Sequence, residues 1–216
     1  SPTFKIQTVT VNGNAQLSRE KIMEIAGIKI GDNIFSKIGI VLKVKLKQNG
    51  AIEEAKVNKI YPNRIDIEIT ERSKRFQIQT ESGKYIGIDE QGYVLGIDSE
   101  KAEVLLIIGM SIKEEEVDKT KRLEQKDLDK MENILQIYSE CKKINIDDKI
   151  TQIQVEDEYI LKLENEGINI NLGNASSLKD KMYYVSAILK QEAGNKGTIN
   201  ANWNLNEGFL PYFSAE

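Results

Sequence analysis

The pattern of apolar and polar residues is most regular between Ala55 and Phe76, and the first third of the chain is organised around this segment. Ile65, Ile67 and Ile69 alternate with polar side chains. Such alternation predicts a strand that is buried on one side only. Residues 61–63, Tyr-Pro-Asn, predict a turn just before it, because proline fixes φ and asparagine tolerates a tight bend. The segment is therefore expected to form a hairpin.

The residues before this hairpin predict one strand and two helices. Residues 4–11 alternate as a strand does and lead into an Asn-Gly turn. Ser18 is expected to cap a helix that Gly27 ends. A second helix is expected from about Ser36 to Gln48. Its inward-facing residues are expected to be Ile38, Val41 and Leu42. The order strand, helix, helix, strand, strand predicts two helices on one face of a three-stranded sheet.

The remaining two thirds of the chain predict a larger, mainly antiparallel β domain with two packed helices. Strands are expected at 76–80, within a hairpin at 85–97, and at 104–108, 150–155, 159–163 and 168–172. Short turns separate the last three, which predicts an antiparallel meander. One amphipathic helix is expected to face inward through Leu128, Met131, Leu135 and Tyr138. The other is expected to begin at a capping-box-like Ser177-x-x-Asp180 and to face inward through Leu178, Met182, Val185 and Leu189.

The C-terminal stretch combines apolar alternation with aromatic residues. One face is expected to hold Ile199, Ala201, Trp203 and Leu205, with asparagines on the other. Residues 209–213, Phe-Leu-Pro-Tyr-Phe, follow Gly208. Because proline cannot donate a hydrogen bond to a β-ladder, this short strand is expected at a sheet edge. An aromatic edge strand is either covered or serves as a docking site.

Composition narrows the possible functions. The chain has 30 Lys+Arg against 34 Asp+Glu, a formal net charge of −4, which argues against a nucleic-acid-binding surface. The absence of histidine excludes Ser-His-Asp and Cys-His catalysis and histidine-ligated metals. The single cysteine, Cys141, cannot form an internal disulfide and is expected to be a small buried hydrophobe. Without phosphate-binding or nucleophile-elbow motifs, we expect no catalysis, cofactor or metal.

Three strings in the first module resemble a POTRA domain: FKIQTVTVNGNAQLSREKI, IKIGDNIF and IYPNRIDIEITER. The Val-x-Gly-Asn start and the Tyr-Pro-Asn…Glu-Arg finish are similar to those of FtsQ/DivIB cell-division proteins. The hairpin at 85–97 and the passage containing Leu172-Gly173 and Lys179 extend the resemblance, although Gly109 lacks the preceding proline that is usual in the family. The expected domains are a POTRA-like domain at 1–72 and a β domain at 73–216.

This resemblance implies a non-catalytic divisome scaffold in bacterial septum formation. It implies a single-pass protein of the cell membrane with this region on the extracytoplasmic side and a membrane helix upstream of Ser1. The implied partners resemble FtsL and FtsB/DivIC, and a partner strand would pair with the C-terminal edge. The matching positions are Trp203, Gly208, Phe209, Leu210, Tyr212 and Phe213. Of these, Phe209, Tyr212 and Phe213 are expected to be anchors, with Trp203 mainly in the core.

Two other functions stay open at this point. A POTRA-containing outer-membrane assembly or secretion component would grip client strands with the POTRA module itself. That function predicts further POTRA repeats or a β-barrel downstream, and no repeat is found in residues 77–216. A cell-wall glycan-binding module could instead use Trp203, Tyr212 and Tyr85 as stacking faces.

Overall fold

The computed structural model describes residues 2–119, 121–203 and 208–216 of the chain. The chain divides into two compact units. The first contains the residues up to Ser73 together with Tyr93–Leu95 and Asp118–Arg122, and the second contains the rest. Every helix in the described ranges is too short or too polar to cross a lipid bilayer.

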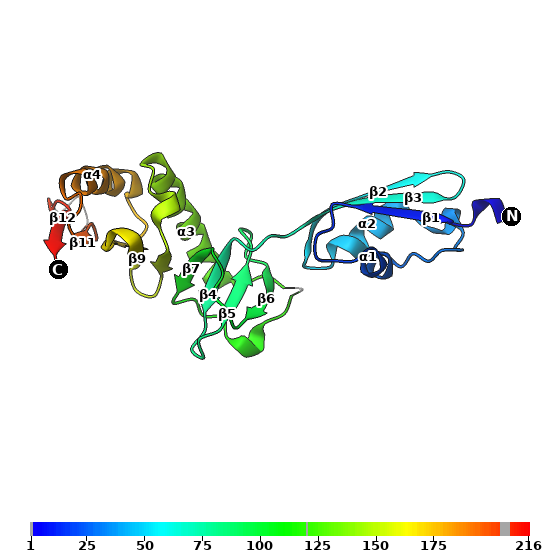
Figure 1. Cartoon of the computed structure of the whole chain (residues 1–216), viewed down its shortest axis with the longest axis horizontal. Helices are drawn as coiled ribbons and strands as arrows, with labels where there is room; N and C mark the ends of the chain where they lie inside the picture. Colours follow the sequence, from blue (N-terminus) through cyan, green and yellow to red (C-terminus); the bar gives the residue numbers. More distant parts are fainter. Residues whose placement is uncertain (1, 120, 204–207) are drawn as a thin grey trace. The chain divides into compact units, whose positions relative to one another are not determined.

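The first unit is a three-stranded sheet with two helices on one face (Figure 1). Its elements are β1 (Thr8–Asn12), α1 (Arg19–Ala26), α2 (Gly39–Lys47), β2 (Ile52–Ile60) and β3 (Arg64–Glu71). The strand predicted from the alternating isoleucines, β3, is the central strand, parallel to β1 and antiparallel to β2. The predicted order of elements is confirmed.

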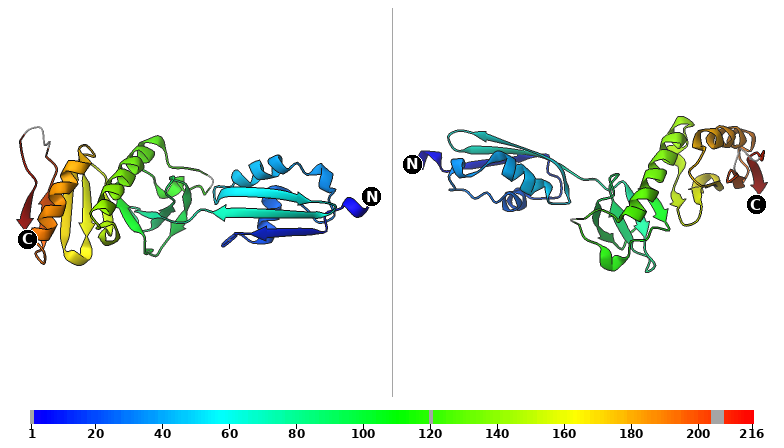
Figure 2. Two further views of the ribbon diagram at one scale, coloured as in Figure 1. Left: turned by 90° about the horizontal axis from the view of Figure 1, so that it is seen from above. Right: turned by 180° about the vertical axis from the view of Figure 1, so that it is seen from behind.

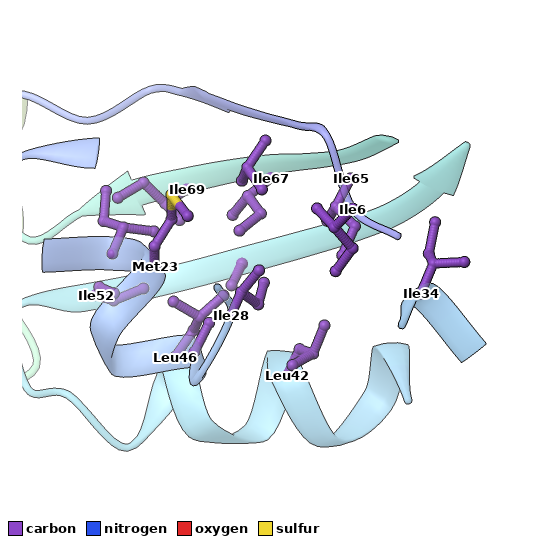
Figure 3. Close-up of a cluster of buried hydrophobic side chains, with 14 residues drawn as sticks. Ile6, Met23, Ile28, Ile34, Leu42, Leu46, Ile52, Ile65, Ile67 and Ile69 are labelled. Carbon is purple, nitrogen blue, oxygen red and sulfur yellow. The ribbon is translucent and has the colours of Figure 1, made fainter. Parts of the chain in front are cut away.

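The core of this unit lies between the sheet and the two helices (Figure 3). Ile65 and Ile67 of β3 are fully buried. On α2 the buried residues are Leu42 and Leu46, one turn apart, whereas Ile38 and Val41 are 59% and 44% exposed. The prediction that Ile38 and Val41 face inward was therefore wrong. Ile38 precedes the helix, because a 3₁₀ turn occupies residues 34–36 and α2 begins only at Gly39, and Val41 lies about 100° around the helix from the buried Leu42.

Polar groups hold the start of α1. The predicted cap is confirmed, since Ser18 Oγ accepts a hydrogen bond from the Lys21 backbone N–H at 3.1 Å. Gly27 ends the helix with φ of +71°. Glu71, the last residue of β3, binds the loop that leads into the helix. Its carboxylate accepts hydrogen bonds from the backbone N–H groups of residues 15, 16 and 17, at 2.8–2.9 Å. The end of the central strand thus fixes a loop more than fifty residues away in sequence.

The second unit contains a nine-stranded sheet with the order β12-β11-β10-β9-β8-β7-β4-β5-β6. Its strands are β4 (Phe76–Gln79), β5 (Tyr85–Ile88), β6 (Val94–Asp98), β7 (Leu105–Ile108), β8 (Gln152–Gln154), β9 (Tyr159–Leu163), β10 (Ile168–Gly173), β11 (Gly197–Asn200) and β12 (Tyr212–Ala215). The meander β8-β9-β10 is antiparallel as predicted. The predicted α+β fold class, a POTRA-type region followed by a mostly antiparallel sheet with helices, is confirmed.

Two helices connect parallel neighbours in this sheet (Figure 2). Helix α3 (Gln125–Lys143) joins β7 to β8, and α4 (Leu178–Gln191) joins β10 to β11; both strand pairs are parallel. Parallel neighbours need a crossover of this length, whereas antiparallel ones need only a turn. The two helices also contact each other.

The inner face of α3 agrees with the prediction at Met131, which is buried, but not at Leu135. Its buried residues are Asp127, Met131, Ile134, Ile137 and Cys141. The predicted inward residue Leu135 is 36% exposed. Asp127 belongs to the buried face, and its carboxylate accepts hydrogen bonds from the backbone N–H groups of Ser111 and Ile112 at 2.9–3.0 Å. Cys141 is buried as predicted.

Candidate functional site

Strand β12 is the outer strand at the C-terminal end of the nine-stranded sheet (Figure 1). It pairs with β11 in an antiparallel register that sets Phe213 opposite Ile199 and Tyr212 opposite Asn200. Among the residues that the structure describes, its other side has no strand partner. The backbone groups on that side can therefore accept an added strand.

Three aromatic residues gather beside this edge and are called the aromatic cluster here: Trp203, Phe209 and Tyr212. The Trp203 ring stacks on Phe209 with centroids 4.9 Å apart and lies 6.4 Å from the Tyr212 ring. Phe209 and Tyr212 are 52% and 48% exposed, and the neighbouring Leu210 is 61% exposed. Trp203 was expected to be mainly core, but it is only half-buried. The cluster is a partly open apolar surface without an ionisable carboxylate or ammonium among its members.

Phe213 lies away from this cluster. Adjacent residues of a strand point to opposite faces of a sheet, so Phe213 and Tyr212 diverge. Phe213 is half-buried and lines a cavity of about 500 Å³ together with Leu189 of α4 and Ile199. The structure thus brings together Trp203, Phe209 and Tyr212 and places Phe213 on the helix-covered face.

Gly208 begins the chain's return toward β12, with φ of +80°, a conformation that favours glycine. Residues 204–207 lie outside the described residues. Leu205, which was expected to share a face with Trp203, is one of them. Tyr85, which could have supplied a third stacking face for a glycan, lies in β5 near the opposite end of the sheet. The structure does not bring it together with Trp203 and Tyr212.

A buried lysine holds the β10–α4 turn, which lies close to the segment before Trp203. Lys181 of α4 is 2% exposed, and its ammonium donates hydrogen bonds to the carbonyl oxygens of Leu172 and Asn174, at 2.7 and 2.9 Å, and to Asn174 Oδ1 at 3.2 Å. Burial lowers the pKa of Lys181. The ammonium gives the carbonyl of the buried Leu172 a hydrogen-bond donor and holds the more exposed Asn174 at the same point of the β10–α4 turn.

The start of α4 differs from its prediction. Ser177 has φ of +52°, and its side chain does not cap the helix, so the predicted capping box was wrong. Lys179, the lysine on which the family resemblance was placed, is exposed, and the lysine bound within the turn is Lys181. The sequence gives only a weak indication that Lys181 is buried: it is a charged residue three positions after Leu178, within the apolar stripe of the helix.

The turn and the segment before Trp203 approach each other closely. A Cβ added at Gly173 would lie 3.0 Å from atoms of Asn202. Asn202 Nδ2 donates to Glu158 Oε1 at 3.2 Å, and Asn171 Nδ2 donates to Glu158 Oε2 at 2.7 Å. One carboxylate therefore joins β10 to the residue immediately before Trp203, which fixes where the aromatic cluster begins.

Comparisons with known proteins cover both units. The FtsQ-type POTRA domain matches residues 4–72, and the C-terminal domain of cell division protein FtsQ/DivIB matches residues 77–202. Cell division protein DivIB of Clostridium botulinum strain Hall is 28% identical over 214 residues, covering 96% of this chain and 82% of the relative. DivIB of Bacillus subtilis strain 168 is 24% identical over 202 residues, 92% of this chain and 72% of the relative. FtsQ of Bradyrhizobium diazoefficiens is 36% identical over 95 residues, 44% of this chain and 28% of the relative.

Proposed function

The chain belongs to the FtsQ/DivIB family of cell division proteins, and we propose that it is a non-catalytic scaffold that binds partner proteins through the free edge of β12. The proposed partners are divisome proteins resembling FtsL and FtsB/DivIC. The proposed location is the extracytoplasmic side of the cell membrane, with a single-pass anchor upstream of Ser1. The observation that carries the proposal is the outer edge of β12, which has no strand partner among the described residues and lies next to a partly exposed aromatic cluster.

The proposed mode of binding is strand addition. A partner strand would form main-chain hydrogen bonds with β12, and its alternate side chains would reach the aromatic cluster. Four residues at one edge offer about four outward backbone groups, each contributing a net of about 1 kcal/mol when bonded. Association itself costs roughly 4–15 kcal/mol in lost freedom, so the backbone bonds cannot supply the affinity alone.

Aromatic anchors would supply the remainder of the binding free energy. Binding energy concentrates in a few large side chains, with tryptophan and tyrosine prominent among them. Phe209 and Tyr212 present half of their surfaces to solvent while resting on Trp203. A rigid stack loses little conformational freedom when a partner covers it. We therefore assign the anchoring role to Phe209 and Tyr212, with Trp203 as the base on which they rest and Leu210 and Gly208 as flanking contacts.

Phe213 has a different role in this proposal. It holds β12 to the sheet from the helix-covered side, where it lies opposite Ile199. It would affect partner binding by fixing the strand rather than by touching the partner's cluster-facing side chains.

A truncation tests the proposal. Ending the chain after Glu207 removes the turn at Gly208 and all of β12. The ectodomain of a DivIC-type partner should lose its affinity for the truncated chain, as measured by titration calorimetry. Circular dichroism and the urea midpoint report whether the remaining sheet is intact. Unchanged affinity in a folded, truncated chain would rule out the β12 edge as the binding site.

A further inference from the structure

Helix α2 of the first unit is apolar on two opposite faces. Leu42 and Leu46 form the buried face. Ile40 and Val44 each lie two residues before one of these leucines, which places them about 200° around the helix, on the far side from the core. They are 72% and 51% exposed. Exposed apolar patches on a protein surface commonly mark interaction sites, so this outer face is a candidate docking surface.

This outer face extends over several neighbours. The exposed aliphatic residues, called the outer stripe here, are Ile38, Ile40, Val41 and Val44. The stripe begins three residues after Phe35, which is 55% exposed and stacks on Tyr61 with centroids 5.3 Å apart. Tyr61 is itself 52% exposed. Aromatic side chains with one polar end are favoured where an apolar phase meets water.

Lysines flank the outer stripe, and the nearest acidic residues in sequence are Asp32 and Glu53. Residues 33–52 contain Lys37, Lys43, Lys45 and Lys47 and no aspartate or glutamate. At 100° per residue, Lys43 and Lys45 fall on the two opposite borders of the stripe. Lys37 and Lys47 form ion pairs with Asp32 and Glu54 at 2.7 and 3.0 Å. Within the described residues, Lys43 and Lys45 form no ion pair.

The charge of residues 1–72, which make up most of the first unit, agrees with this local pattern. Residues 1–72 contain 12 Lys+Arg and 8 Asp+Glu, a net of +4, although the complete chain has a net charge of −4. Positive charge is therefore concentrated in the first unit, and its unpaired part on α2 borders the exposed aliphatic residues.

We infer that the outer stripe of α2 is a docking surface for an anionic phospholipid bilayer. Aliphatic side chains would enter the region between headgroups and acyl chains, and Lys43 and Lys45 would lie along the headgroup phosphates. The lysines favour lipid over protein as the occupant, because lysine is enriched on interfacial helices and depleted from the cores of protein interfaces. A symmetric pairing of two copies is disfavoured, since it would bring the same lysines against each other.

Lipid vesicles test this inference. The chain should bind vesicles of equal parts phosphatidylglycerol and phosphatidylcholine in a flotation assay, and should not bind vesicles of phosphatidylcholine alone. Each lysine near an anionic surface contributes about a fivefold gain in partitioning, so K43Q/K45Q should lower binding by roughly 30-fold. The charge-matched control K126Q/K142Q, which changes two exposed lysines of α3, should bind as the unchanged chain does. I40S/V44S should abolish binding even at low salt.

A site-specific probe distinguishes docking through the outer stripe from nonspecific electrostatic attraction between the chain and anionic vesicles. V44C labelled with an environment-sensitive dye should shift its emission to the blue on anionic vesicles. The matched control is K56C, on β2, whose side chain lies on the face of the sheet that has no helices; it should show no shift. Equal shifts at both positions would overturn the inference, as would vesicle binding that survives I40S/V44S. A blue shift at V44C without lipid that grows with protein concentration would assign the stripe to self-association and overturn it too. None of these readouts involves the β12 edge, so the two proposals can fail independently.

Discussion

Replacing Lys181 with methionine should destabilise the second unit and loosen the segment that carries the aromatic cluster. Methionine retains most of the buried volume but none of the three hydrogen bonds to Leu172 and Asn174. The Leu172 carbonyl, left buried without this donor, costs about 1–3 kcal/mol, and each hydrogen bond lost at the more exposed Asn174 costs about 1 kcal/mol. Removing a buried ammonium, whose pKa is lowered by burial, recovers part of that cost. We expect a net loss of about 2 kcal/mol.

The matched control is K179M, because Lys179 is an exposed lysine on the same helix. Urea unfolding followed by the fluorescence of Trp203, the single tryptophan, reports on the C-terminal end of the sheet. The K181M midpoint should fall, and its thermal midpoint should drop by roughly 4–8 °C relative to K179M. If the two variants unfold together, the hydrogen bonds of Lys181 do not hold the β10–α4 turn, and the argument for its role fails.

Three further predictions concern single residues. Burial alone would raise the pKa of Glu71, but the backbone N–H groups of Leu17, Gln16 and Ala15 outweigh it and lower the pKa below the ordinary 4.5. E71Q should therefore lower the free energy of unfolding of the first unit by about 1–2 kcal/mol above pH 4.5. This deficit should shrink as pH falls through the lowered pKa of Glu71. The control is E68Q, and a difference in urea stability between E71Q and the unchanged chain that does not vary with pH would contradict the prediction. Burial raises the pKa of Cys141 to about 12, so a maleimide should label it at neutral pH only as the chain unfolds; rapid labelling of the folded chain would refute this. In G13A the new Cβ would overlap the Ile69 carbonyl oxygen at a φ of +81°, so it should lose roughly 2–3 kcal/mol, more than G31A, where φ is +94° and no atom lies nearby; equal losses in thermal unfolding would contradict this.

Local patterns predicted those elements whose cause is local. The alternation of Ile65, Ile67 and Ile69 defines the buried face of β3 without reference to the rest of the chain. Ser18 and Gly27 act within one turn of the helix that they bound. The short turns made the meander β8-β9-β10 predictable, because strands joined by a short turn pair as antiparallel neighbours.

The features that were missed depend on distant residues. Helix α2 has apolar residues on both faces, so periodicity could not decide which face is buried. The burial of Asp127 depends on backbone N–H groups at Ser111 and Ile112, and that of Lys181 on carbonyls at the end of β10. A sequence pattern does not show that such hydrogen-bond partners will lie next to these side chains in the fold.

At the candidate site, the sequence indicated the aromatic edge but not its division into two faces. The string Phe-Leu-Pro-Tyr-Phe reads as one patch. In the structure Tyr212 joins Phe209 and Trp203, while Phe213 turns to the helix-covered side. The stacking of Trp203 on Phe209 bridges residues on both sides of 204–207 and could not be inferred from spacing.

The binding of a DivIC-type ectodomain to F209A/Y212A tests the central claim most directly. Loss of two aromatic anchors should raise the dissociation constant by about 1,000-fold, because anchor residues each contribute about 2 kcal/mol to binding. The matched control is Y183A, which removes an aromatic side chain of α4 that is 73% exposed and lies outside the cluster. F209A/Y212A should lose most of its affinity for the partner and Y183A none, with both variants folded. Full affinity in F209A/Y212A, or equal losses of affinity in both variants, would contradict the proposed anchoring role.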